Sequence, residues 1–270
     1  MLWLLLLALP DAGLLARPIE VSADHLQVLN KEGRAIYTGH ARALRDTTTV
    51  TCDILTVFYA AGRDVSRIEA LGHVQAVDQD RTATGERATF DNLTGVLIVD
   101  GHPQARMGNR TVKGDRVTFT TGLDRVEVTR ARTVAPNESS AQGATVEIDA
   151  DLLVLEDKKA TAVWTGNVRA RRGPTLIKAP ELTAHYDEHG VVTQVQARGG
   201  VEATDADKWA RGQRADYDNK KGVLVVTGQP EARQGPNKMR GSKITFITGK
   251  DTLEVENATT VLQVEKKPHP

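Results

Sequence analysis

Two stretches decide the fold. Residues 22–43 read SADHLQVLNKEGRAIYTGHARA, and residues 149–170 read DADLLVLEDKKATAVWTGNVRA. In both, apolar residues alternate with polar ones, a polar turn follows, and a second alternating run passes through a Thr-Gly pair. Alternation of this kind places one set of side chains on one face of a β-strand. Each stretch therefore predicts two antiparallel strands joined by a turn.

A shift of 127 residues, which relates these two stretches, also aligns the rest of the two halves without a gap. GERATFDNLTGVL from Gly85 meets GQRADYDNKKGVL from Gly212, and KGDRVTFTTGLDRVEV from Lys113 meets RGSKITFITGKDTLEV from Arg240. A repeat that covers both halves predicts two copies of one domain in tandem. We expect the first domain at 17–135, a polar linker at 136–145, the second domain at 146–265 and a tail at 266–270.

The chain begins with an uncharged apolar run, Leu2 to Leu9, followed by Pro10 and small residues. This run is too short to span a bilayer, which needs about 20 apolar residues. It is typical of the hydrophobic part of a secretory signal peptide, which we place at 1–16. The segment therefore predicts export across the inner membrane, with an ordinary buried strand as the alternative.

A glycine followed by one variable residue recurs six times, in YTGHARA, LGHVQAV, DGHPQAR, WTGNVRA, RGGVEAT and TGQPEAR. In YTGHARA the glycine keeps the spacing of the apolar residues around it, which predicts Gly39 on the inward face and His40 outward. A glycine within a strand marks a bulge or a bend, and a bent strand can pass from one sheet to another. The alternative is that each glycine ends one strand and begins the next. Either way, the pattern predicts an all-β antiparallel fold with almost no helix.

The order, number and spacing of these units resemble the LptA/OstA-like family of periplasmic lipopolysaccharide-transport proteins. The resemblance rests on the Ala-Asp-x-Leu-x-Val runs, their polar turns and the Gly-Asn-Val strand end, which occurs here only at Asn167. It implies tandem open, twisted antiparallel β-jellyroll (OstA-like) domains located in the periplasm. It also implies lipopolysaccharide, through its lipid A part, as the ligand, carried from the inner to the outer membrane.

The same resemblance implies partners that stack end to end through exposed edge strands. They are an inner-membrane LptC-like jellyroll domain, an outer-membrane LptD-like jellyroll domain, and a second copy of the chain in head-to-tail self-association. We expect the joining edges in IEVSADHLQVL, from Ile19, and in DTLEVENATTVLQV, from Asp251. Unprotected sheet edges favour such pairing.

The apolar positions of the alternating strands are the expected lipid-binding, inward-facing residues. Two hypotheses remain open for them: they shield acyl chains in an apolar groove, or they form the dry core of a structural β-repeat protein that assembles through its edges. A third hypothesis, a hydrolase with scattered catalytic residues, has no residue that the sequence can nominate. The expected lipid-contact residues are Leu26, Val28, Tyr37, Leu55, Val57, Phe90, Leu97, Val117, Phe119, Leu153, Leu155, Trp164, Leu182, Tyr217, Leu224, Ile244 and Phe246.

Composition argues against several functional classes. Lys+Arg and Asp+Glu both number 35, so the net charge is zero and no strongly basic nucleic-acid-binding surface is expected. Cys52 is the only cysteine, which rules out a disulfide within the chain and favours a small core residue. The sequence has no Gly-rich phosphate loop, Gly-x-Ser-x-Gly elbow or Cys-x-x-Cys pair. We therefore expect no enzyme, cofactor or metal.

Three of the seven histidines follow the repeated glycine, but in the second half Asn, Gly and Gln take their places. A reactive role is therefore not repeated, and exposed surface positions are expected. Acidic residues that begin strands, such as Asp24 and Asp53, are expected to cap turns. Arginines recur in register and could hold phosphate, but their outward positions favour a solvated face. The positions are His40, His73, His102, Asn167, Gly200 and Gln229, and the paired arginines are Arg42 with Arg169, Arg87 with Arg214, and Arg106 with Arg233.

Overall fold

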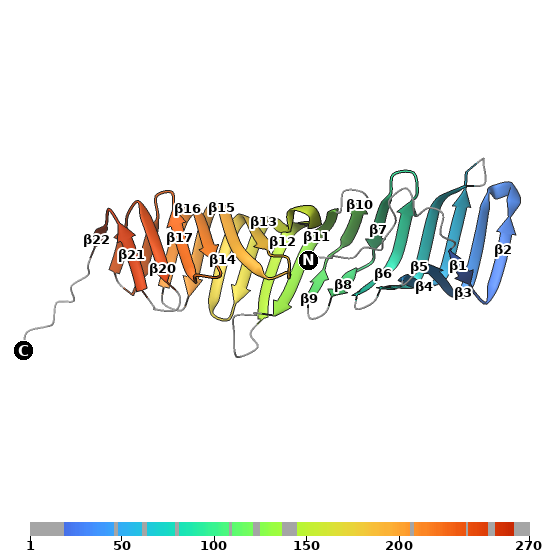
Figure 1. The fold of residues 1–270 in the computed structure, drawn as a ribbon, viewed down its shortest axis with the longest axis horizontal. Coiled ribbons are helices and arrows are strands. Elements are labelled where there is room, and N and C mark those ends of the chain that lie inside the picture. Colours follow the sequence, from blue (N-terminus) through green and yellow to red (C-terminus); the bar gives the residue numbers. More distant parts are fainter. Residues whose placement is uncertain are drawn as a thin grey trace, which may run out of the picture. The chain divides into compact units, whose positions relative to one another are not determined.

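The protein was analysed as a computed structural model, in which nearly all the described residues form strands joined by turns (Figure 1). Two short 3₁₀ helices, Asn30–Glu32 and Asp157–Lys159, are the helical elements among the described residues. The predicted all-β class is therefore confirmed. None of the described helices is long and apolar enough to cross a membrane. The described residues are 19–45, 48–60, 64–78, 81–107, 110–120, 125–136, 145–205, 208–235, 237–247 and 252–261.

The chain divides into two compact units, one with residues 2–136 and 152–159 and the other with 137–151 and 160–270. Strand β12 (Thr145–Glu156) contributes its first part to the second unit and its later part to the first. The domain boundaries expected from the repeat stay a prediction. The expected signal peptide, most of the linker and the tail lie outside the described residues.

Among the described residues of the first unit, eleven strands precede β12. They are β1 (Glu20–Ser22), β2 (His25–Leu29), β3 (Arg34–Arg45), β4 (Thr48–Tyr59), β5 (Val65–Asp78), β6 (Arg81–Asp91), β7 (Val96–Asp100), β8 (Gln104–Met107), β9 (Arg110–Lys113), β10 (Arg116–Thr120) and β11 (Arg125–Pro136).

The second unit repeats this order after β12. Its strands are β13 (Thr161–Arg172), β14 (Thr175–Tyr186), β15 (Val192–Asp205), β16 (Lys208–Asp218), β17 (Val223–Thr227), β18 (Glu231–Gln234), β19 (Asn237–Arg240), β20 (Lys243–Ile247), β21 (Thr252–Glu256) and β22 (Thr259–Val261).

The long strands of each unit belong to two layers of sheet at once. In the first unit, residues 87–91 of β6 pair with β7, whereas residues 81–84 pair with β8. The ladder then continues through β10 on one side and through β9 on the other, and β11 pairs with both. In the second unit β16 makes the same switch between β17 and β18. A long strand can therefore leave one layer and enter the other, which is one of the two alternatives for the repeated glycine. At Gly101 and Gly228 the other alternative holds, because these glycines lie between the end of one strand and the start of the next.

The core of the first unit lies between its two layers. Leu55 and Ala70 come from the layer that contains β7, and Ala41, Cys52 and Val74 come from the layer that contains β8. These side chains form one buried apolar cluster, in which Ala41 is completely buried. Burial raises the pKa of the Cys52 thiol, and its Sγ–H donates to the carbonyl of Ile54. Cys52 is thus the core residue that the sequence predicted.

In β3 the repeated glycine motif forms a two-residue bulge, and the strand bends there. Thr38 pairs with Ile54 and Ala41 with Cys52, so Gly39 and His40 together lie opposite a single residue. Both bulge residues have positive φ, +77° and +45°. Glycine adopts this conformation at no steric cost, whereas a residue with a side chain requires compensation.

A polar side chain from the neighbouring segment supplies that compensation. His40 Nδ1 lies 2.7 Å from Asp24 Oδ2, and Asn167 Nδ2 donates to Asp151 Oδ2 at 2.8 Å. A Cβ added to Gly39 would overlap the Asp24 carboxylate, so glycine also makes room for this partner. The expectation that Gly39 belongs to the inward apolar face is therefore wrong.

The bulge in β15 lacks a polar partner and has glycine at both of its positions. There the neighbouring side chain is Pro180, which offers no hydrogen-bond acceptor, and both bulge residues are glycines, Gly199 and Gly200. The motif is therefore a corner between two layers, and its variable residue depends on the partner across from it.

Candidate functional site

The second unit has an apolar hollow between its two layers. Tyr217 and Leu224 reach it from the layer with β17, and Ala203 and Ala210 reach it from the layer with β18. The hollow is shallow, with a cavity volume of about 30 Å³, and it is partly open to solvent. Its lining is Ile177, Leu182, Val195, Ala197, Val201, Ala203, Ala210, Arg211, Ala215, Tyr217, Leu224 and Val226.

Three of the expected lipid-contact residues line this hollow: Leu182, Tyr217 and Leu224. Leu182 is buried, whereas Tyr217 and Leu224 are half-buried and so keep accessible apolar surface at the hollow. Tyrosine and leucine side chains at such positions provide apolar contact area without closing the site.

The remaining expected residues lie at different depths. Ten of the seventeen are buried in the core, and five of these come from the second half: Leu153, Leu155, Trp164, Leu182 and Ile244. The other five buried residues are Leu55, Val57, Leu97, Val117 and Phe119. Tyr37, Phe90, Tyr217, Leu224 and Phe246 are half-buried, while Leu26 and Val28 are exposed. Lipid contact at these residues stays a prediction.

The alternation of inward and outward residues, used to predict the inward face, does not identify the lining residues beyond each corner. On β16 the inward positions are Tyr217 and Ala215, and then Gly212 and Ala210, because the corner shifts the spacing from two to three. On β14 the same shift separates Leu182 from Ala179. Ile177, Val201, Ala203 and Ala210 were missed for this reason, and the glycine motif itself was the signal that could have located the shift.

The recurring histidines are exposed, as expected, and have a structural role at the corners. The side chains of His40, His73 and His102 are 92%, 91% and 93% exposed and lie against Asp24, Asp53 and Glu86. Contact with Asp24, mainly through the hydrogen bond, raises the pKa of His40 above its ordinary value. Within the described ranges, no group of three or more His, Cys, Asp or Glu side chains could hold a metal ion.

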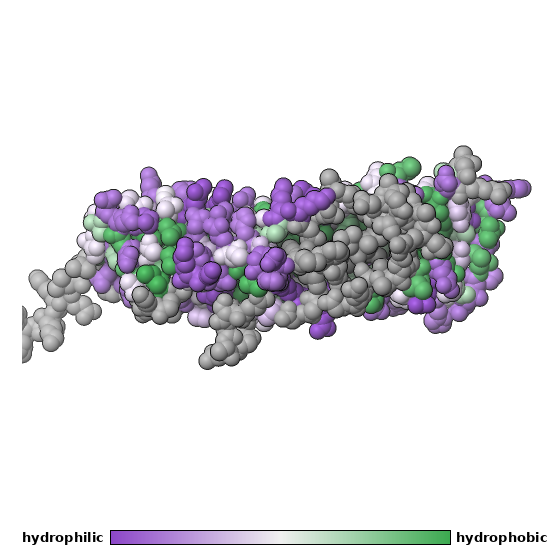
Figure 2. Space-filling model, viewed as in Figure 1, coloured by the Kyte–Doolittle hydropathy of each residue, from purple (hydrophilic) through white to green (hydrophobic). Residues whose placement is uncertain are grey.

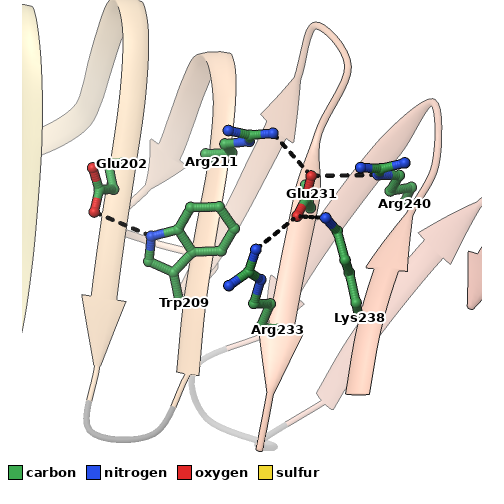
Figure 3. A network of polar contacts seen from close by, with 7 residues as sticks. All are labelled: Glu202, Trp209, Arg211, Glu231, Arg233, Lys238 and Arg240. Carbon is green, nitrogen blue, oxygen red and sulfur yellow. Dashed lines mark hydrogen bonds and ion pairs between the residues drawn. The ribbon is translucent and has the colours of Figure 1, made fainter. Parts of the chain in front are cut away.

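A cluster of cations surrounds one buried carboxylate on β16, β18 and β19, and one of these cations, Arg211, also lines the hollow (Figure 3). The Glu231 side chain is 3% exposed and contacts Arg211, Arg233, Lys238 and Arg240. The paired arginines of the sequence are exposed, as expected. The convergence of Arg233 with three other cations was missed, because pairing by repeat position does not reveal neighbours across strands.

Comparison with known proteins finds a family that matches both halves of the chain. The family described as LptA/(LptD N-terminal domain) LPS transport protein matches residues 20–125 and 147–252. An uncharacterized protein of Rhizobium meliloti (strain 1021) is 35% identical over 91 residues, which cover 31% of this chain and 48% of that protein. The chain thus spans about half the length of this curated relative.

One solved structure with similarity to the chain is LptH, the LptA homologous periplasmic component of the conserved lipopolysaccharide transport device from Pseudomonas aeruginosa. The match has a TM-score of 0.41 and 20% sequence identity, and it covers 44% of this chain and 95% of that chain.

Proposed function

Because the chain belongs to the LptA/LptD N-terminal family of lipopolysaccharide-transport proteins, we propose that it carries lipopolysaccharide across the periplasm. The acyl chains of lipid A lie between the two layers of a unit, and the sugars remain outside. The apolar hollow of the second unit is the observation that carries this proposal.

The physical chemistry of the hollow suits a carrier better than a storage protein. Each buried methylene contributes about 0.8 kcal/mol, so a deep closed pocket for several acyl chains would hold lipid too tightly to release it. The hollow is partly open, and four of its lining residues are alanines. Small side chains leave space between the layers, and an open side gives the lipid a route in and out.

A structural β-repeat protein with a dry core is the second candidate. Leu153 and Ile244 favour it, because both are completely buried and pack as ordinary core residues do. In that case the edge strands would carry the function and the interior would hold no ligand.

Site-specific photo-cross-linking distinguishes the two candidates. A photoreactive amino acid at Tyr217 or Leu224, on the hollow, should form adducts with lipopolysaccharide added to the purified chain. Asp216 and Val225 are matched controls, since each is the adjacent residue on the same strand with its side chain on the opposite face. Absence of adducts at both hollow positions, with the variants folded, would overturn the carrier proposal and favour the dry core.

We also propose that edge strands join the chain to its partners. Within the described residues, β2 pairs with β3 alone, and Leu26 and Val28 on β2 are 49% and 54% exposed. Figure 2 shows apolar side chains exposed along these strands, at the right of the view. A further strand pairing with this edge would cover both side chains and satisfy its backbone groups. The candidates are the LptC-like domain, the LptD-like domain and a second copy of this chain.

A further inference from the structure

The cations around Glu231 converge from three adjacent strands of the second unit (Figure 3). Arg211 Nη2 and Arg240 Nε lie 3.0 and 3.3 Å from Glu231 Oε2. Lys238 Nζ and Arg233 Nη2 lie 2.5 and 3.5 Å from Oε1. One buried carboxylate thus has four positively charged groups within 3.5 Å of its oxygens.

The ring of Trp209 contacts two of these cations, Arg211 and Arg233. The guanidinium carbons of Arg233 and Arg211 lie 5.0 and 5.6 Å from the centre of the Trp209 ring. The ring in turn is held by Glu202, whose Oε1 accepts a hydrogen bond from Trp209 Nε1 at 3.1 Å. Cation–π contacts and ion pairs therefore hold the arginine side chains in place before any ligand arrives.

The cluster keeps an excess of positive charge. Four cations face two carboxylates, Glu231 and Glu202, which leaves about two positive charges without compensation inside the cluster. The side chains of Arg211, Arg233 and Arg240 are 57%, 55% and 61% exposed, so their remaining N–H groups are accessible. A phosphate group carries a charge of about −1.5 to −2 at neutral pH, which matches this excess.

The first unit shows that the fold does not require the cluster. At the equivalent positions, Gln104 replaces Glu231, Thr84 replaces Arg211, and Thr82 replaces Trp209. Thr111 stands in place of Lys238, and the pairing of β6, β8 and β9 is the same as that of β16, β18 and β19. The first unit keeps cations only at the equivalents of Arg233 and Arg240, which are Arg106 and Lys113. It supports the same strands without the buried carboxylate, the tryptophan and the other two cations, so stabilisation of the fold alone does not explain the cluster.

We propose that Arg211, Arg233, Lys238 and Arg240, arranged by Glu231 and Trp209, form a binding site for a phosphate group on the second unit. Guanidinium groups present paired N–H donors that match phosphate oxygens, and Lys238 adds a point charge. The phosphate is that of an anionic glycolipid or a free phosphate ion. Glycolipid as the source rests on the proposed carrier function, whereas the site itself does not.

Titration of the full chain with inorganic phosphate, at constant ionic strength maintained with sodium chloride, tests the site directly. The R233Q/R240Q double variant removes two exposed cations and leaves Arg211 and Lys238 to pair with Glu231. We expect saturable phosphate binding by the native chain and an affinity lower by about tenfold or more in R233Q/R240Q. R106Q, at the position equivalent to Arg233 in the first unit, is the matched control and should bind as the native chain does.

A second variant keeps the test decisive if removal of the arginines disturbs folding. E231Q raises the excess charge of the cluster, so the cations repel one another more strongly and the folded state loses stability. Bound phosphate should restore it, and phosphate should therefore raise the Tm of E231Q more than chloride at the same ionic strength does. A purely structural cluster predicts equal shifts with the two anions.

Lipopolysaccharide with and without its phosphate groups identifies the source. If the glycolipid provides the phosphate, dephosphorylation and R233Q/R240Q each weaken lipid binding, and the two losses do not add. If phosphate binds but lipid binding is indifferent to both changes, the ligand is a free phosphate. Equal phosphate affinity in the native chain and R233Q/R240Q, or equal Tm shifts for E231Q, would overturn the site. Neither result depends on adducts at Tyr217, so failure of the carrier proposal remains distinguishable.

Discussion

His40 Nδ1 lies 2.7 Å from Asp24 Oδ2, and His40 itself has a φ of +45°. The ion pair is therefore tied to a backbone conformation that L-residues rarely adopt. It connects the segment between β1 and β2 to the bend of β3, at the point where the strand passes between layers.

This pair predicts a pH dependence. The folded-state pKa of His40 is raised by Asp24, so the stabilisation is fully present below the ordinary histidine pKa and is lost as pH rises through the raised value. NMR titration should find the His40 pKa above 6.5 in the native chain and lower in D24N. The difference in Tm between the native chain and D24N should also be larger at pH 5.5 than at pH 8.5. A His40 pKa that is unchanged in D24N would contradict the role given to this pair.

The corner glycine predicts a specific loss of stability. In G39A the new Cβ meets the Asp24 carboxylate at a φ of +77°, so both the backbone conformation and the His40 pair are disturbed. We expect a loss of about 1–3 kcal/mol in the free energy of unfolding, measured by urea denaturation. G173A is the control, because Gly173 also has positive φ but no atom lies within 4 Å of its added Cβ. A loss in G39A no larger than in G173A would show that the carboxylate contact is unimportant.

The buried core predicts a large effect from a single truncation. Ile244 is completely buried on β20 between Val226 and Val255, its cross-strand partners. I244A should reduce the free energy of unfolding by about 2–5 kcal/mol, since it removes apolar contacts and leaves a cavity. V261A, on a side chain that is 60% exposed, should change it by less than about 0.5 kcal/mol. Similar losses in the two variants would mean that β20 does not pack as described.

The exposed edge predicts concentration-dependent assembly. Lysines at Leu26 and Val28 would place charge on the edge strand β2, and charged edges resist pairing. The native chain should gain mass with concentration in light scattering after size exclusion, while L26K/V28K should remain monomeric. L93K, on a turn residue that is 86% exposed, is the control and should behave as the native chain does. Assembly that persists in L26K/V28K would place the contact elsewhere.

Much of the fold was predictable from the sequence, because local patterns specify it. Alternation in HLQVL and its repeat determines which faces are apolar, and polar turns separate the strands. Of the two alternatives left open at the repeated glycine, a bent strand is found at Gly39, Gly72 and Gly166, whereas Gly101 lies between the end of β7 and the start of β8. The candidate site was only partly predictable. Leu182, Tyr217 and Leu224 were identified by alternation, but Ala203 and Ala210 lie beyond corners that shift the spacing.

The sequence by itself determined the all-β class, the tandem repeat and the apolar faces, since each depends on neighbours a few residues apart or on similarity at a constant shift. Only the tertiary structure decided which positions meet across strands. Asp24 meets His40 from sixteen residues away, and Glu231 gathers cations from β16, β18 and β19. Such contacts arise from strand register and from the switch between layers, which place distant residues side by side without leaving a local signal in the chain.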